Sequence, residues 1–348
     1  MRWLVAIASC GCALAADVSP EMLMRANHFK KARALVEQRY RANPNDPETC
    51  WLLSEIRHEW RDLDAAETLA EKAVAANPRD ARYHLQLSGV LGDRAEKASL
   101  LHQIGLARRF RKELDAALAL DPKNAEALNY LMLYYYEAPG IVGGDKRKAH
   151  EVPAQIQAVD PVKGYFAQIW LARADKQEDR LEDLYRKAVE AQPASYEAHL
   201  ALAYYYNSRK KTAEAESEAR RALALDPSLV GAYNLLAGMS ALLGKWKDLD
   251  DILDRSEKNV PDDWSPSYWA ANACLGKSVE LPRAERYLRH YLTQEPEPTS
   301  PNHAQAHLQL GRVLDKQGRR PEAIAEWQAS VKLNPNSPAR EELKKAQR

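Results

Sequence analysis

The chain has 348 residues, with 50 lysines and arginines against 49 aspartates and glutamates and a formal net charge of +1. Its basic clusters, such as residues 108–112 and 209–211, each have acidic neighbours, so the one-signed basic stripe expected of a nucleic-acid-binding protein is missing. Helix-forming Ala, Leu, Glu, Lys and Arg dominate, and no alternating, strand-like run stands out. These features predict an all-α protein.

The N-terminus has the pattern of a secretory signal peptide over residues 1–16. Arg2 supplies a positive charge, residues 3–8 are apolar and too short to span a bilayer, and small residues at 13–16 provide a cleavage site. Residues 7–10 (Ile-Ala-Ser-Cys) also resemble a bacterial lipoprotein processing box, which would acylate Cys10. We favour simple cleavage near Ala16 because only nine residues precede Cys10. An ordinary buried first helix is the third alternative.

Prolines recur through the rest of the chain at near-regular spacing. A small or apolar residue stands twelve positions before each one, for example Ala66 before Pro78 and Ala215 before Pro227. A period of about 34 residues is the length of one helix-turn-helix unit. Residues 17–337 therefore divide into nine units, which end near Pro44, Pro78, Pro122, Pro161, Pro193, Pro227, Pro261, Pro296 and Pro335.

The second unit shows how each one is built. The segments 48–60 and 65–76 both repeat their apolar residues every three or four positions, as amphipathic helices do. Asp64 is placed to cap the second helix. Pro78 ends that helix, because proline lacks the N–H group and restricts the residue before it. The small side chain of Ala66 lets the two helices approach closely.

Three features depart from this pattern. The third unit carries about ten extra residues near 92–109, which predict longer helices. The fourth contains an inserted loop, residues 138–145 (A-P-G-I-V-G-G-D), whose glycines permit a tight excursion. A contact site at this loop is a less favoured alternative. Pro153 lies inside a predicted second helix, which it should kink.

The C-terminal part contains a link and a tail. Residues 295–301 (E-P-E-P-T-S-P) predict a stiff, extended link before the last unit. Residues 338–348 are strongly polar and predict the terminal capping helix that a repeat array needs for solubility. Outside the signal, the cysteines are Cys50 and Cys274, which lie in the second and the eighth unit, so we expect no disulfide between them.

Over residues 24–337 the repeat resembles the tetratricopeptide repeat (TPR). The clearest copies are residues 196–229 and 303–337. In the second of these copies the family's signature positions are occupied by Leu310, Gly311, Gly318, Ala323 and Pro335. The resemblance, to exported bacterial TPR proteins in particular, implies a right-handed α-α superhelical solenoid of about nine units.

The sequence contains little that points to catalysis, a metal site or a cofactor. His303 and His307 are four residues apart, but no glutamate between them could act as a base. His307 also shares its register with His84 and His199, which favours a repeated packing role. The glycines of residues 140–146 lack the order of a phosphate-binding loop, and no predicted strand precedes them. We therefore expect no enzyme activity, metal or cofactor.

The resemblance implies that the first helix of each unit lines a concave binding face. Aromatic side chains there supply contact area with a polar handle, and asparagine can hydrogen-bond a peptide backbone from two sides. Within each of the tyrosine triplets 134–136 and 204–206, at least one ring must belong to the core. The predicted groove residues are Trp51, Glu55, His58, Asn129, Tyr136, Glu137, Tyr204, Asn207, Asn234 and Trp269.

The function predicted from these features is that of an exported scaffold. It would bind a protein or peptide segment in its concave groove, in the periplasm or cell envelope, and serve envelope assembly or maintenance. Glu55 in the groove register would repel the acidic C-termini that some TPR modules clamp. Two alternatives remain: a lipoprotein scaffold tethered to a membrane through Cys10, and a protein that binds envelope polysaccharide by stacking aromatic rings on sugars.

Overall fold

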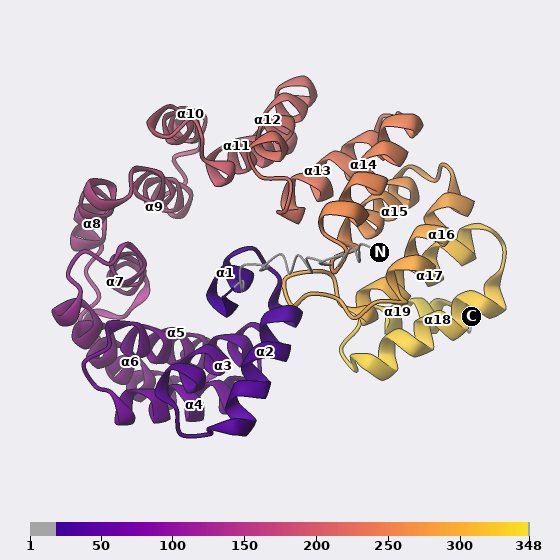
Figure 1. Cartoon of the computed structure of the whole chain (residues 1–348). Helices are drawn as coiled ribbons and strands as arrows, with labels where there is room; N and C mark the ends of the chain where they lie inside the picture. Colours follow the sequence, from indigo (N-terminus) through magenta and orange to yellow (C-terminus); the bar gives the residue numbers. More distant parts are fainter. Residues whose placement is uncertain (1–18, 347–348) are drawn as a thin grey trace, which may run out of the picture.

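The computed structural model describes residues 19–346, which form α-helices and two 3-10 turns, η1 (Gly140–Val142) and η2 (Glu178–Arg180), with no β-strand among them (Figure 1). The predicted signal peptide lies outside the described residues. The helices are α1 (Pro20–Arg25), α2 (Phe29–Ala42), α3 (Pro47–Glu59), α4 (Leu63–Ala76), α5 (Ala81–Lys97), α6 (Leu100–Leu120), α7 (Ala125–Glu137), α8 (Lys146–Val159), α9 (Pro161–Ala174), α10 (Leu181–Ala191), α11 (Tyr196–Ser208), α12 (Thr212–Leu225), α13 (Val230–Leu242), α14 (Trp246–Asn259), α15 (Ser265–Lys277), α16 (Leu281–Tyr291), α17 (His303–Lys316), α18 (Arg320–Leu333) and α19 (Ala339–Ala346).

The helices follow one another in pairs, which confirms the predicted all-α solenoid. Within a pair the two helices pack together, as α3 does on α4 and α17 on α18, and each pair also contacts the next one. The first helices, such as α7, α9 and α11, lie toward the inside of the curve, and the second helices lie outside (Figure 1). The short α19 packs on α18 at the C-terminal end.

Small residues at the predicted positions hold each pair together. Six alanines stand twelve residues before a repeat proline, and all six are 0% exposed: Ala32, Ala66, Ala149, Ala215, Ala284 and Ala323. A methyl group there lets the paired helices approach closely, and a larger side chain would force them apart. The period seen in the sequence is therefore the spacing of these close contacts.

The turn inside the second unit differs by two residues from the prediction. Helix α4 begins at Leu63, and Asp62 rather than Asp64 caps it by accepting a hydrogen bond from the Ala65 N–H at 3.4 Å. The chain turns earlier because Arg61 adopts a left-handed conformation with φ 61°. The helix therefore starts one residue beyond Asp62, which leaves Asp64 in its first turn.

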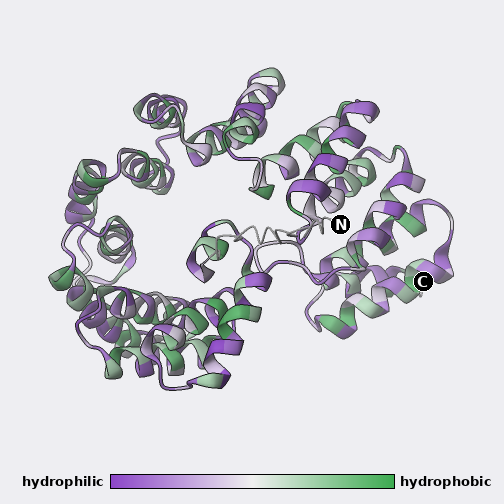
Figure 2. Cartoon of the chain, in the orientation of Figure 1, coloured by the Kyte–Doolittle hydropathy of each residue, from purple (hydrophilic) through white to green (hydrophobic). Residues whose placement is uncertain are grey.

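The helices are amphipathic, and Figure 2 shows hydrophilic and hydrophobic residues together on the helices of the array. Within residues 19–346, no helix is long and apolar enough to cross a membrane. Both Cys50 and Cys274 are buried and free. The apolar surface is thus used between neighbouring helices, as expected of a repeat array.

The third and fourth units carry the predicted insertions. Helices α5 and α6 have 17 and 21 residues, whereas α3 and α4 have 13 and 14. The extra residues extend the two helices together beyond the ends of their neighbours. Pro153 lies buried within α8.

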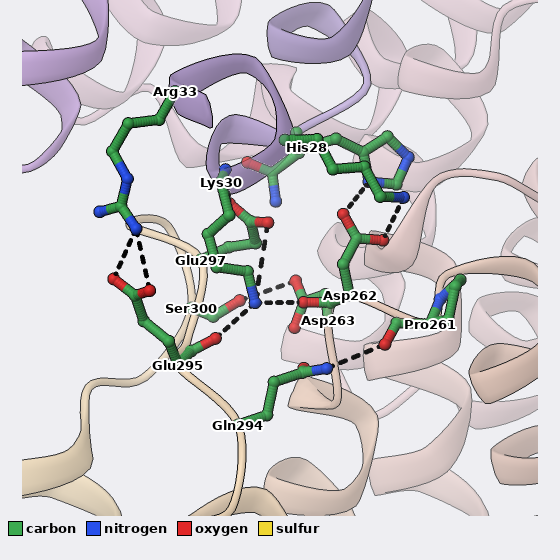
Figure 3. A network of polar contacts seen from close by, with 12 residues as sticks. His28, Lys30, Arg33, Pro261, Asp262, Asp263, Gln294, Glu295, Glu297 and Ser300 are labelled. Atoms are coloured by element: carbon green, nitrogen blue, oxygen red, sulfur yellow. Dashed lines mark hydrogen bonds and ion pairs between the residues drawn. The ribbon is translucent and has the colours of Figure 1, made fainter. Parts of the chain in front are cut away.

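The array closes on itself through a polar contact between its N-terminal end and two distant loops (Figure 3). Arg33 of α2 makes a two-pronged ion pair with Glu295, at 2.9 and 3.1 Å. Asp262 accepts from the Lys31 ammonium at 2.9 Å and lies 2.7 Å from Nδ1 of His28. We refer to the basic residues His28, Lys30, Lys31 and Arg33 and the acidic residues 262, 295 and 297 as the closure contact.

Lys30 and Glu297 form the buried centre of the closure contact. The Lys30 ammonium donates to the backbone oxygens of Asp262 and Glu295, and its backbone N–H donates to Oε2 of Glu297 at 3.1 Å. The Glu297 side chain is 0% exposed, and its Oε1 has no hydrogen-bond partner among the described residues. Burial therefore raises the pKa of Glu297 to about 7, although Lys30 opposes the shift. Burial also acts on Asp262, but hydrogen bonds from His28 and Lys31 overcome it and lower the pKa of Asp262 to about 2.

Reversing charges in the closure contact should open the ring. We expect the double substitution Lys31→Glu and Arg33→Glu to place like charges opposite Asp262 and Glu295, and to increase the radius of gyration measured by small-angle X-ray scattering. Arg25→Glu with Arg39→Glu is the matched control, because neither arginine has a side-chain partner among the described residues. Identical scattering from both double variants would show that these ion pairs do not hold the ends together.

Glu297 should make the stability of the closed array depend on pH. Its pKa is higher in the folded protein than the ordinary value of 4.5, so the folded state binds the extra proton between these two values. Its contribution is full below pH 4.5 and is lost as pH rises through about 7. Between pH 5 and pH 8, wild type should lose about 2 kcal/mol more than Glu297→Gln, as measured by urea unfolding. Parallel pH profiles for the two proteins would contradict the assignment.

Candidate functional site

A hollow of about 340 Å³ crosses the inner face of three successive units. It is formed by α11, α13 and α15, the first helices of the sixth, seventh and eighth units. The lining residues are Tyr204, Asn207, Asn234, Leu235, Gly238, Met239, Leu242, Trp269, Asn272, Ala273 and Gly276. We call it the α11–α15 groove. Four of the ten predicted groove residues, Tyr204, Asn207, Asn234 and Trp269, lie in it together.

The groove follows from the period of the repeat. Tyr204, Gly238 and Asn272 are spaced by 34 residues, so they occupy equivalent positions on the three helices, as Leu235 and Trp269 do on two of them. Glycine at 238 leaves the floor open between the larger side chains. Tyr204 and Trp269 remain 45% and 41% exposed, which is unusual for rings of this size and makes them available for contact.

The asparagines give the groove hydrogen-bonding groups without charge. Oδ1 of Asn234 accepts from the Ser265 hydroxyl at 2.9 Å, which orients the amide and leaves its N–H groups free to donate. The side chains of Asn207 and Asn272 make no hydrogen bond within residues 19–346. The Tyr204 hydroxyl donates to the Gly231 backbone oxygen at 3.3 Å. The groove thus presents neutral donors and acceptors between aromatic faces.

Trp51 is not a groove residue, which corrects the prediction. It is 7% exposed, its ring lies 6.0 Å from that of Tyr83, and the guanidinium of Arg82 covers it at 4.5 Å. Tyr83 and Arg82 belong to the first helix of the next unit, α5. The following unit therefore covers the position on α3 that the register assigned to the inner face.

Glu55 is partly buried on α3, and its surroundings oppose the charge expected of it. Burial raises the pKa of Glu55 to about 8, and the nearby charges of Glu126 and Glu21 act in the same direction. This shift disfavours the charged form of Glu55, on which the predicted repulsion of a carboxylate depends.

Tyr136 packs between the fourth and fifth units, which corrects its assignment to the groove. Its hydroxyl donates to Asp175 at 2.8 Å, and the ring of Trp170 meets it edge-on at 5.2 Å. Lys146 lies over the ring at 4.4 Å. Asn129 lies on α7, outside the α11–α15 groove, and is partly buried. The other two predicted residues, His58 and Glu137, line a second hollow near α5.

Sequence reasoning missed Asn272 and Leu242, which complete the groove. Asn272 stands 68 residues after Tyr204, or two repeat lengths, so applying the period to the tyrosine could have found it. Leu242 is 46% exposed at the end of α13 and forms an apolar edge. Its exposure depends on the turn that follows, which the sequence pattern does not determine.

The histidines in the repeated register have a packing role. Nδ1 of His84 lies 2.6 Å from Glu113 and that of His199 lies 2.5 Å from Glu218, so each joins the first helix of its unit to the second. The imidazole of His307 pairs in the same way with Glu326, at 2.6 Å. In the part of the chain that the structure describes, no group of three or more His, Cys, Asp or Glu residues is placed to hold a metal ion.

Paired helices with small residues at a 34-residue period define an α-helical repeat scaffold. Family profiles described as the tetratricopeptide repeat match residues 182–230 and residues 304–337. The chain therefore contains tetratricopeptide repeats. Repeats of this family mediate protein–protein interaction, and the protein is accordingly an interaction scaffold.

Individual relatives are distant. No curated protein matches the chain. Among solved structures, the chain is similar to a thermophilic TPR protein of Thermus thermophilus, with 21% identity over 53% of this chain and 94% of the other, and a TM-score of 0.47. A tetratricopeptide repeat protein of Parabacteroides merdae is 16% identical over 87% of this chain and 99% of its own, with a TM-score of 0.44. With TM-scores below 0.5, these similarities add nothing to the functional assignment.

Replacing each of the two predicted groove tryptophans by alanine should show which indole lies in the core and which on the surface. We expect Trp51→Ala to lower the free energy of unfolding by about 3–5 kcal/mol, because it leaves a cavity among α3 and α5 residues. The same substitution at the exposed Trp269 should cost less than about 1 kcal/mol. Urea unfolding followed by circular dichroism measures both. Equal losses would place the two indoles in equivalent environments and contradict the groove.

Proposed function

We propose that this protein holds an extended, uncharged segment of a partner protein in the α11–α15 groove. The observation that carries the proposal is the set of asparagine amides without internal partners between the exposed rings of Tyr204 and Trp269. Such amides can pair with the N–H and C=O groups of a peptide backbone. The rings offer contact area for the segment's apolar side chains. The lining lacks charged residues, which favours a neutral segment over an acidic or basic one.

We further propose that the protein is exported and acts in the periplasm or cell envelope, in assembly or maintenance of the envelope. The support is the charged, apolar and small-residue pattern of residues 1–16. The fold is also compatible with an oxidising compartment, because burial raises the pKa of the Cys274 thiol to about 11 and keeps it unreactive. Mass spectrometry of the mature N-terminus distinguishes cleavage near Ala16 from an acylated Cys10, which would tether the scaffold to a membrane.

Site-specific cross-linking tests the location of the binding surface. A photoreactive phenylalanine analogue at Leu242 lies at the edge of the groove, whereas the same analogue at Leu225 lies at the end of the outer helix α12 with similar exposure. Cross-links to one peptide segment from position 242 but not from 225 support the proposal. Equal cross-linking would contradict it. If purified envelope glycan binds and competes with cross-linking at 242, polysaccharide is the ligand instead.

The unpaired asparagines should matter for binding and not for stability. We expect Asn207→Ala and Asn272→Ala each to weaken binding of the cross-linked segment, made as a synthetic peptide, by about fivefold to tenfold, because each removes hydrogen bonds to its backbone. The free energy of unfolding should change by less than about 0.5 kcal/mol. Asn129→Ala is the matched control outside the groove. Fluorescence anisotropy measures the affinities, and equal losses for Asn129→Ala would place the segment elsewhere.

A further inference from the structure

A second hollow, of about 400 Å³, lies between α5, α6 and α7 and shares no lining residue with the α11–α15 groove. Ten of its seventeen lining residues belong to the two insertions, residues 92–109 and 138–145, that set the third and fourth units apart from the others. The hollow therefore exists because of the departures from the repeat. We call it the insertion pocket.

The loop that closes one end of the insertion pocket is fixed in place. The Tyr134 hydroxyl donates to the backbone oxygen of Val142, and the Asp145 N–H donates to that of Tyr135 at 2.8 Å. Gly143 has a left-handed φ of 100°, and a side chain at Gly144 would clash with the Ala138 carbonyl. Only glycine fits at position 144. The wall is thus a defined structure and not a loose excursion.

Aromatic and aliphatic side chains form the walls of the insertion pocket. Phe110 stacks on Tyr134 with ring centroids 5.5 Å apart and planes inclined by 11°. Tyr130 lies 6.3 Å from Phe110 on the same side, and Ile104 and Leu133 complete the apolar surface. This volume and lining are those of a site for a small organic molecule.

The charged groups of the insertion pocket are acidic, and two of them have no partner. Asp93 is neutralised by Arg61 and lies 2.9 Å from Nε2 of His58. Glu96 and Glu137, in contrast, make no hydrogen bond or ion pair through their side chains within the described residues. Partial burial of its carboxyl group raises the pKa of Glu137 even though the side chain is largely exposed, and the charge of Glu96 raises it further, so the two carboxylates repel each other. A cation between them would relieve that repulsion.

We propose that the insertion pocket binds a small organic cation: an amine or quaternary ammonium group on an apolar body. The apolar body would occupy the space between Ile104, Leu133 and the aromatic rings, and the positive charge would lie near Glu96 and Glu137. Aromatic faces attract cations, so the ring of Phe110 adds to the carboxylates instead of opposing them, whereas Tyr134 already has the Arg111 guanidinium 5.4 Å over its ring. This binding site is additional to the peptide groove, and neither site depends on the other.

Titration of the full chain with three probes of similar shape tests the proposal. Phenethylamine carries the positive charge, phenethyl alcohol is neutral, and phenylacetate is negative. We expect saturable one-to-one binding of phenethylamine by isothermal titration calorimetry, at least about fivefold weaker binding of the alcohol and no binding of phenylacetate. The affinity for phenethylamine should fall as salt is added. Equal affinity for the amine and the alcohol, or no saturable binding of the amine at millimolar concentration, would overturn the proposal.

Substitutions then locate the site. Glu96→Gln and Glu137→Gln should each weaken phenethylamine binding by about twofold to fivefold, since both side chains are exposed at the mouth. Glu126→Gln removes the same charge from the first turn of α7, outside the pocket, and should leave the affinity unchanged. Ile104→Trp should fill the pocket and abolish binding, with Ala107→Phe as a second filling variant if circular dichroism shows that the first is misfolded. An equal loss for Glu126→Gln, or full binding in a folded filling variant, would exclude this site.

Discussion

The close approach of paired helices at fully buried alanines is the constraint on which the rest of the structure depends. Ala32, Ala66 and Ala215 have no exposed surface, and each stands at the point where two helices touch. Repeating that contact about every 34 residues fixes the angle from one unit to the next. The first helices are thereby turned inward, and side chains at equivalent positions, such as Tyr204 and Asn272, form rows across the inner face. The α11–α15 groove is a consequence of this packing.

The same constraint brings the two ends of the array together. His28 and Asp262 are 234 residues apart in the chain and 2.7 Å apart in space, because small rotations accumulate over many units. No local pattern predicts such a contact: the sequence assigns no role to residues 28–33 and predicts only a link over residues 295–301. The structure shows that this link also binds the N-terminal end of the array, through Lys30 and Arg33. Glu297 of this link is buried in the closure contact beside Lys30.

Periodicity predicted the fold and four residues of the α11–α15 groove, and the wrong assignments of groove residues have a common cause. Tyr204, Asn207, Asn234 and Trp269 share one hollow because period and register are enough to place them on neighbouring inner helices. Trp51 was misplaced because register identifies the face of a helix but not the side chains that cover it. Arg82 and Tyr83 of the next unit cover Trp51, and the register of α3 carries no information about the size and charge of these neighbours. The assignment of Tyr136 to the groove is wrong for the same reason, because Asp175 and Trp170 of the next unit contact this side chain.

The two hollows arise in opposite ways, and the difference bears on function. The α11–α15 groove uses positions that the repeat supplies anyway. The insertion pocket needs extended helices α5 and α6 and a loop in which Gly144 has no room for a side chain, and none of these is required to stack one unit on the next. A glycine held in one conformation loses more entropy on folding than other residues do. Two unpaired carboxylates, Glu96 and Glu137, add repulsion at the pocket mouth. Features that stabilise neither the unit nor the array are best explained by a ligand that offsets them when it binds.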